Sequence, residues 1–319
     1  MALALLLILL ILALMVGGAV ALAITVSGRP VPAPSQAADL ARQHAIGVNL
    51  AAWVAGGIPA VVLSFALLDA TNVTYDSRLP ETGVPAPGPL LVALSPAVIG
   101  LAYLVVHAIG ERTWPRPTGA VRRAALVPRG DAAPRWLRRI TWAWAVLLIA
   151  SLVATGLTAT DGRTFSRPDP ADPGDLLVIP YAGWPYGVPL IVVTALIVAA
   201  TEGVLRLVAR RPAVIDADPG YDAASRRLSA HRVLRGTQLL LAGSLAGVLV
   251  VTGVGVAMVD ADSAGIGMAV AWLGYVIAAV GVGLAIVPAR PAVPARPAVP
   301  ARPADMVDGA PVPVAGPPT

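Results

Sequence analysis

The chain has 319 residues, of which 57% are hydrophobic and only 13% are charged, with a formal net charge of +5. Soluble domains carry about 25% charged residues, so this polar fraction excludes a water-soluble globular protein. No cysteine is present, which excludes disulfides, thiolate catalysis and cysteine-ligated metals.

The apolar residues are concentrated in long continuous runs. A helix of about 20 residues crosses roughly 30 Å of hydrocarbon, and continuous apolar runs favour helices over barrel strands. We therefore predict an all-α fold, a polytopic transmembrane bundle of about seven spans within residues 1–287. The predicted spans lie near residues 2–26, 46–68, 89–110, 140–159, 188–208, 237–258 and 265–287.

Residues 2–26 form the first apolar run, and no charge precedes Arg29. A secretory signal has a basic start and a shorter apolar core, so we interpret this run as a span. Cleavage after Ala21-Leu22-Ala23 is the alternative.

The arginines are distributed unevenly among the connections between these spans. Residues 111–139 hold eight arginines against two acidic residues, and residues 206–235 hold seven against three, whereas the alternate connections are acidic. Arginine-rich connections stay cytoplasmic, so we expect the amino terminus outside and the carboxyl terminus inside. The same arginines suit contact with anionic lipid headgroups, and their placement explains the net charge without a nucleic-acid partner.

Composition also bears on location and on the end of the chain. All 23 basic residues are arginine, and this bias, with abundant alanine, valine, glycine and proline, indicates a high-GC genome and a bacterial cytoplasmic membrane.

Residues 288–319 contain three near-identical Pro/Ala/Arg hexads. Regular prolines prevent a helix, so we predict a disordered cytoplasmic tail, with a ligand for proline-recognition modules as the alternative.

Polar residues inside the spans are the candidate functional residues. His107 and Glu111 share a helix face, as do Glu202 and Arg206, and Asn49 lies in the second span. We interpret His107 and Glu111 as interfacial residues, with proton relay or metal ligation as the alternative. We interpret Glu202 and Arg206 as an ion pair, with proton relay as the alternative.

Small residues predict how the last two spans pack. Gly243 and Gly247 have the GxxxG spacing, Gly274 lies in the next span, and a six-residue connection makes the two spans neighbours. Glycines let helix backbones approach closely, so we expect these three to lie in a helix–helix contact. Homodimerisation through Gly243 and Gly247 is the alternative.

Two segments carry a resemblance. GERTWPRPTGAVRRAAL at residues 110–126 and YAGWPYGVP at residues 181–189 resemble segments of uncharacterised polytopic membrane proteins of high-GC bacteria. The similarity covers the third to the seventh span. It implies the architecture only, because no activity is assigned to that group.

Three classes of function fit the sequence. The scarcity of ionisable residues within the spans favours a non-catalytic accessory, sensor or assembly component, whose partner is another membrane protein or a second copy of the chain. A membrane-embedded enzyme would require His107 and Glu111 to meet a third polar group in a pocket. No residue pattern predicts a catalytic, metal or cofactor site.

A transporter or permease subunit is the remaining class. It would require the polar and helix-breaking residues of three spans to converge on one wet cavity. These residues are Asn49, Pro59, Ser95, Pro96 and Glu202.

Overall fold

The protein is described from a computed structural model. The structure describes residues 18–20, 23, 33–70, 87–115, 133–159, 165–168, 176–179, 181, 183–214, 217, 219–258 and 261–287. Most of the predicted span at residues 2–26, and the predicted tail at residues 288–319, lie outside these ranges. The count of seven spans and the orientation therefore stay predictions.

Long helices make up most of the described chain. They are α2 (Gln36–Ala70), α3 (Pro87–Arg112), α4 (Arg135–Thr158), α5 (Trp184–Arg210), α6 (Pro219–Ala257) and α7 (Ala261–Ile286). In five of them, α3 to α7, a stretch of the helix is long and apolar enough to cross a membrane. The predicted membrane-helical class is thus supported, and the predicted span at residues 46–68 falls within α2.

Two helices begin well before the predicted spans. The oxygen of the Ser35 side chain accepts a hydrogen bond from the backbone N–H of Ala38 at 3.1 Å, so Ser35 caps α2 ten residues ahead of the predicted start. Helix α6 begins at Pro219 instead of residue 237 and has 39 residues, about 58 Å at 1.5 Å per residue. The prediction that residues 206–235 form a connection is therefore wrong in its second half.

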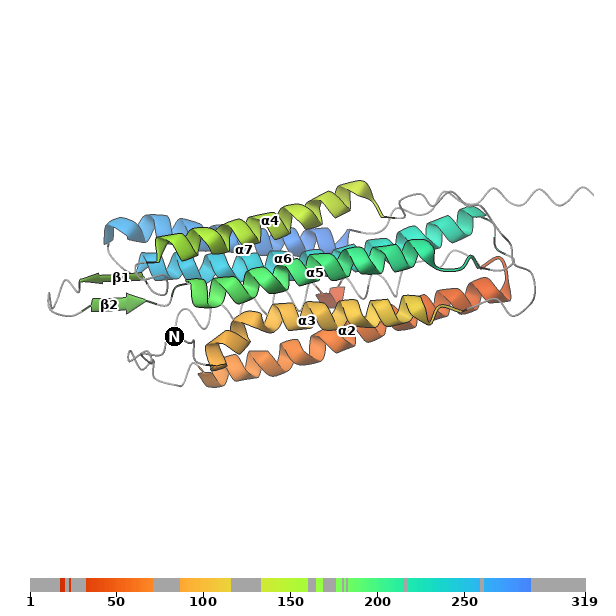
Figure 1. Ribbon diagram of the computed structural model, residues 1–319, viewed down its shortest axis with the longest axis horizontal. Helices are drawn as coiled ribbons and strands as arrows, with labels where there is room; N and C mark the ends of the chain where they lie inside the picture. Colours follow the sequence, from red (N-terminus) through yellow and green to blue (C-terminus); the bar gives the residue numbers. More distant parts are fainter. Residues whose placement is uncertain are drawn as a thin grey trace, which may run out of the picture.

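The helices pack as three hairpins of sequence neighbours, α2–α3, α4–α5 and α6–α7, and the last of these confirms the predicted contact between the last two spans. They run along the long axis of the molecule, with α2 and α3 side by side below the others in this view (Figure 1). Helix α6 also contacts α3, α4 and α5. It is 61% buried over its apolar window against 28% for α7, so α6 is the central helix and α7 is peripheral.

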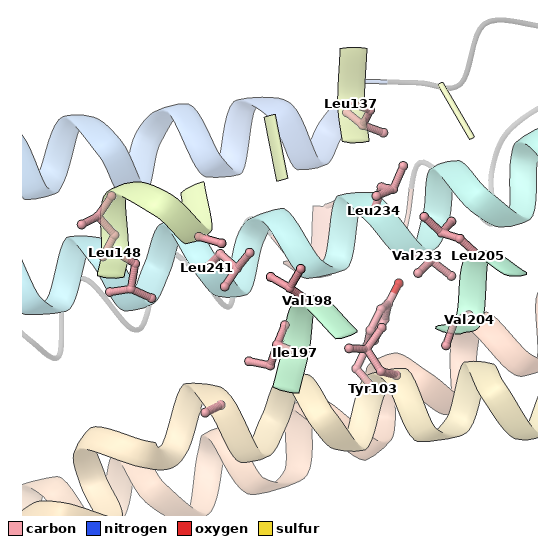
Figure 2. Close-up of a cluster of buried hydrophobic side chains, with 14 of the residues drawn as sticks. Tyr103, Leu137, Leu148, Ile197, Val198, Val204, Leu205, Val233, Leu234 and Leu241 are labelled. Carbon is pink, nitrogen blue, oxygen red and sulfur yellow. The ribbon is translucent and has the colours of Figure 1, made fainter. Parts of the chain in front are cut away.

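The core lies where α3, α4, α5 and α6 meet. Figure 2 shows Leu137 and Leu148 of α4, Ile197 of α5 and Leu241 of α6 directed into this space. Large apolar side chains are also exposed on the outside of the bundle, including Leu157 at 72%. An apolar outer surface around a packed core is what a helical bundle solvated by lipid requires.

Close backbone contacts join α6 and α7. A Cβ atom at Gly253 would lie 2.5 Å from the backbone nitrogen of Ala271, and one at Gly274 would lie 2.8 Å from the carbonyl oxygen of Ala246. The predicted role of Gly274 is therefore confirmed. The predicted role of Gly247 in this contact is wrong, because a Cβ atom there would meet no heavy atom within 4 Å.

Gly243, the other half of the GxxxG pattern, is buried on α6. The helices cross so that Gly253, Gly267 and Gly281 make close contacts in addition to Gly274. Small residues do bring the two helices together, but the crossing angle selects a different set from the one the spacing indicated.

One antiparallel hairpin departs from the all-α prediction. Strand β1 (Phe165–Pro168) pairs with β2 (Leu176–Ile179), with Phe165 opposite Ile179. It lies between α4 and α5, at the end of the bundle away from the starts of α2 and α6 (Figure 1). Its strands have four residues each, too short for the alternating pattern that would have predicted them.

Candidate functional site

Buried and partly buried polar residues gather at the end of the bundle where α3 and α5 finish and α2 and α6 begin. We call this group the buried polar cluster. It comprises His44 of α2, His107 and Glu111 of α3, Arg211 just after α5, and Asp222, Ser225, Arg226, Ser229 and Arg232 of α6. The long extension of α6 supplies most of it.

Arg211 is the centre of the cluster. Its guanidinium lies 3.4 Å from the Glu111 carboxylate, donates to the hydroxyls of Ser229 and Ser225 at 3.0 and 2.8 Å, and stacks 3.7 Å over the Trp114 ring. The Arg211 side chain has no exposed surface. Burial lowers the pKa of Arg211 from the usual arginine value, and the Glu111 carboxylate opposes that shift.

Arg226 ties α6 to the end of α5. It pairs with Asp222 one turn away at 2.8 Å and donates to the carbonyl oxygens of Val208, Ala209 and Arg211. The last carbonyls of a helix have no intrahelical partner, so this guanidinium caps α5.

A small cavity lies beside Arg211. Its lining includes His44, His107, Glu111, Ser229 and Arg232. The volume is about 10 Å³, which is room for roughly one water molecule. The predicted pair of His107 and Glu111 therefore does meet further polar groups in one cavity, but this conformation has no space for a substrate.

Aromatic contacts hold the α3 side of the cavity. The His107 ring packs against Tyr103 with centroids 4.6 Å apart, and the Tyr103 hydroxyl donates to the carbonyl oxygen of Arg232 at 2.9 Å. Figure 2 shows Tyr103 reaching from α3 toward α6. It crosses α6 at Gly236, where a Cβ atom would overlap the tyrosine ring, so this position requires glycine.

Arginine outnumbers carboxylate at this end of α6. Glu111 and Asp222 neutralise Arg211 and Arg226, whereas Arg232 donates to the carbonyl oxygen of Ala45 at 3.2 Å. Within the described part of the chain, Nε of Arg232 and Nε2 of His107 are buried without a hydrogen-bond partner. The cluster is thus a network of hydrogen bonds and ion pairs that joins the helices and carries a net positive charge.

Glu202 does not pair with Arg206, so that prediction is wrong. Nε and Nη2 of Arg138 donate to its two carboxylate oxygens at 2.8 and 2.7 Å, and Nε1 of Trp142 donates to one of them at 3.1 Å. The antiparallel hairpin brings α4 level with Glu202, and a bidentate pair is geometrically better than an exposed i,i+4 pair. Arg206 is exposed.

Deeper polar groups bond within the bundle. Gln238 of α6 is fully buried and donates to the carbonyl oxygen of Leu137 at 2.7 Å, which joins α6 to α4. The hydroxyls of Thr201 and Thr237 lie 3.2 Å apart, and each also donates to the carbonyl four residues back in its own helix. Such bonds satisfy these donors within the bundle.

The residues proposed for a transport path are dispersed among the described helices. Asn49 and Ser95 are buried, Pro96 lies inside α3, and Glu202 faces α4. None of these four lines the cavity beside Arg211. The side chain of Pro59 lies outside the described residues.

The sequence indicated only part of this site. It singled out His107 and Glu111, but not Arg211, Asp222 or Arg232. The spacing of Asp222 and Arg226 was a readable signal for an i,i+4 pair on a helix, whereas the Glu111–Arg211 contact joins residues 100 positions apart.

Comparisons with known proteins add no identity: no family model, curated protein or solved structure matches the chain. Among the described residues, no group of three or more His, Cys, Asp or Glu side chains is placed to hold a metal ion. The described chain is a helical bundle in which five helices are long and apolar enough to cross a membrane, which supports a multi-pass membrane protein.

Proposed function

We propose that the protein is a non-catalytic integral membrane component, an accessory, sensor or assembly subunit. The arginine-rich end of α6 lies on the cytoplasmic side in this proposal. The observation that carries the proposal is the structural role of the charged side chains in the buried polar cluster. The two acidic side chains of the buried polar cluster, Glu111 and Asp222, both hold helix ends together.

The packing of the membrane-spanning part supports the same proposal. Its deep polar groups bond across or within helices, as Gln238 and Thr201 do. A transporter needs polar groups that face a hydrated path, and charges on such a path are usually paired around a cavity. The cavity beside Arg211 holds roughly one water molecule and lies at the end of the bundle.

Water access to the bundle interior tests the proposal. The chain has no native cysteine, so single-cysteine variants can be labelled without background. Asn49→Cys and Thr201→Cys place thiols at buried positions, and Ala213→Cys, in the exposed connection between α5 and α6, is the reactive control. The proposal predicts that a charged, water-soluble thiol reagent modifies only the control in reconstituted vesicles.

Rapid modification of both buried thiols by the same reagent would contradict the proposal and favour a transporter. Proton or cation flux in vesicles that is lost in Glu202→Gln would have the same meaning. Unreactive thiols in vesicles that carry no flux would support a packed, non-conducting bundle.

A membrane-embedded enzyme is the second candidate function, and one observation favours it. His107, Glu111 and His44 line the same cavity. Such a function requires the cavity to open, so it predicts that a charged thiol reagent reaches a cysteine placed at His107. An unreactive His107→Cys variant would contradict it.

A further inference from the structure

The outer surface of the α4–α5 hairpin combines arginines and apolar side chains in one stripe. The ion pair between Arg138 and Glu202 joins α4 to α5 and shows which residues of the two helices lie at the same height in the bundle. Arg135 precedes Arg138 by three residues on α4, and Arg206 follows Glu202 by four residues on α5. Because the helices are antiparallel, both arginines lie one helical turn closer than the pair to the end of the bundle that holds the buried polar cluster.

These two arginines are exposed. Within the described part of the chain, neither is within ion-pair distance of a carboxylate, since Glu202 is engaged by Arg138 and Trp142. Two exposed positive charges on adjacent helices at one level attract an anion to this surface. The first turn of α4 carries no acidic residue, and this adds to the positive potential there.

Exposed apolar residues continue the stripe along both helices. Trp142, 48% exposed, and Val146, 60% exposed, continue it along α4. Ala199 and Ala195 of α5 are exposed and small, and they continue it along α5. A tryptophan at this depth, with its N–H bonded and its ring toward lipid, is typical of the membrane interface.

We propose that this stripe binds one anionic phospholipid. The headgroup phosphate lies between Arg135 and Arg206, and an acyl chain follows Trp142 and Val146 beside the exposed alanines. Arginine binds phosphate through two N–H groups, and the exposed apolar residues supply the continuous contact that a lipid requires and that a free phosphate does not. The inference requires a membrane-embedded bundle but not the proposed non-catalytic role.

The charge requirement is tested by native mass spectrometry of the detergent-solubilised protein. Phosphatidylglycerol and phosphatidylcholine are added at equal concentration, and the bound fraction of each is measured. At about fivefold in affinity per arginine, the double variant Arg135→Gln/Arg206→Gln should lose phosphatidylglycerol binding by about 25-fold. The matched control Arg112→Gln/Arg227→Gln removes two exposed arginines from the same end of the bundle and should change binding by less than about twofold.

Equal losses in the two double variants would overturn the site, because they would show diffuse attraction to the whole arginine-rich end. A wild-type protein that shows no preference for phosphatidylglycerol would overturn it as well. Helical circular dichroism and a monodisperse elution profile establish that each variant is folded. The measurement is made in detergent, so failure of the proposed orientation or of the non-catalytic role would not affect it.

The apolar part of the stripe is tested separately from the charge. Ala199→Trp places a large side chain where the acyl chain is proposed to lie and leaves every arginine in place, so it should lower phosphatidylglycerol binding at least several-fold. Glycerol phosphate, which has the same charge but no acyl chain, should not displace the lipid. Unchanged lipid binding in Ala199→Trp, together with displacement by glycerol phosphate, would show a bare phosphate site and contradict the proposal.

Discussion

The contact between α6 and α7 gives the sharpest stability prediction, because it contains two glycines with opposite surroundings. A Cβ atom at Gly253 would stand 2.5 Å from the nitrogen of Ala271 and 2.6 Å from the carbonyl oxygen of Gly267. Both neighbours are backbone atoms, so neither can rotate away. At Gly247, on the same helix, a Cβ atom would meet nothing within 4 Å. Gly253→Ala and Gly247→Ala are therefore a matched pair that adds the same methyl group.

The magnitude follows from the space at each position. The methyl group at Gly253 forces the two backbones apart by roughly 1 Å, and a gap of that size forfeits a quarter to a half of each dispersion contact across the interface. Overpacking of this kind costs about 1–3 kcal/mol. At Gly247 the substitution is free of clashes and gains up to about 1 kcal/mol of helix propensity. The same propensity gain applies at Gly253, so the two variants should differ by the overpacking cost of about 1–3 kcal/mol.

Thermal unfolding in detergent measures this difference, with the intrinsic fluorescence of the seven tryptophans as the signal. At about 2–4 °C per kcal/mol, Gly253→Ala should unfold at least about 2 °C below Gly247→Ala. Equal midpoints for the two variants would refute the close backbone contact between α6 and α7. A lower midpoint for Gly247→Ala than for Gly253→Ala would place the contact on the other face of α6.

Two further predictions concern the ion pairs. Arg211→Met leaves the Glu111 carboxylate buried without its cation, so it should lower the free energy of unfolding by about 3–5 kcal/mol. The double variant Arg211→Met/Glu111→Gln should restore part of that stability. A single variant no less stable than the double variant would contradict the ion-pair role of Arg211. Glu202→Gln breaks the ion pair with Arg138, whose side chain is 39% exposed, so the free energy of unfolding measured by thermal unfolding should fall by at most about 1 kcal/mol. A larger fall would contradict this expectation and show that the pair is a main contribution to the packing of α4 against α5.

The sequence predicted where the helices lie better than where they begin and end. Apolar runs locate the part of a helix that is solvated by lipid, and α3, α4, α5 and α7 agree with the predicted spans to within a few residues. Helix α6 does not, because its first half is polar and helical at once: Pro219 suits a helix start, and the alanine, arginine and leucine that follow are good helix formers. Hydropathy alone has no signal for such an extension.

The candidate site was predictable only where it depends on local spacing. His107 and Glu111 share a helix face, and both line the cavity. The partners of Glu111 and Glu202 come from other helices, so no local rule could identify Arg211 or Arg138. For Glu202 the local rule was misleading, since Arg206 had the correct spacing but Arg138 offered two parallel hydrogen bonds.

Sidedness tests the central claim most directly, because the proposed role places the arginine-rich end of the bundle in the cytoplasm. Ala213→Cys lies in the exposed connection between α5 and α6 at that end, and Asp262→Cys lies at an exposed position in the first turn of α7 at the other. In intact bacterial cells, a membrane-impermeant maleimide should label Asp262→Cys at once and Ala213→Cys only after the membrane is permeabilised. Labelling of both cysteines in intact cells, or of Ala213→Cys alone, would contradict the account.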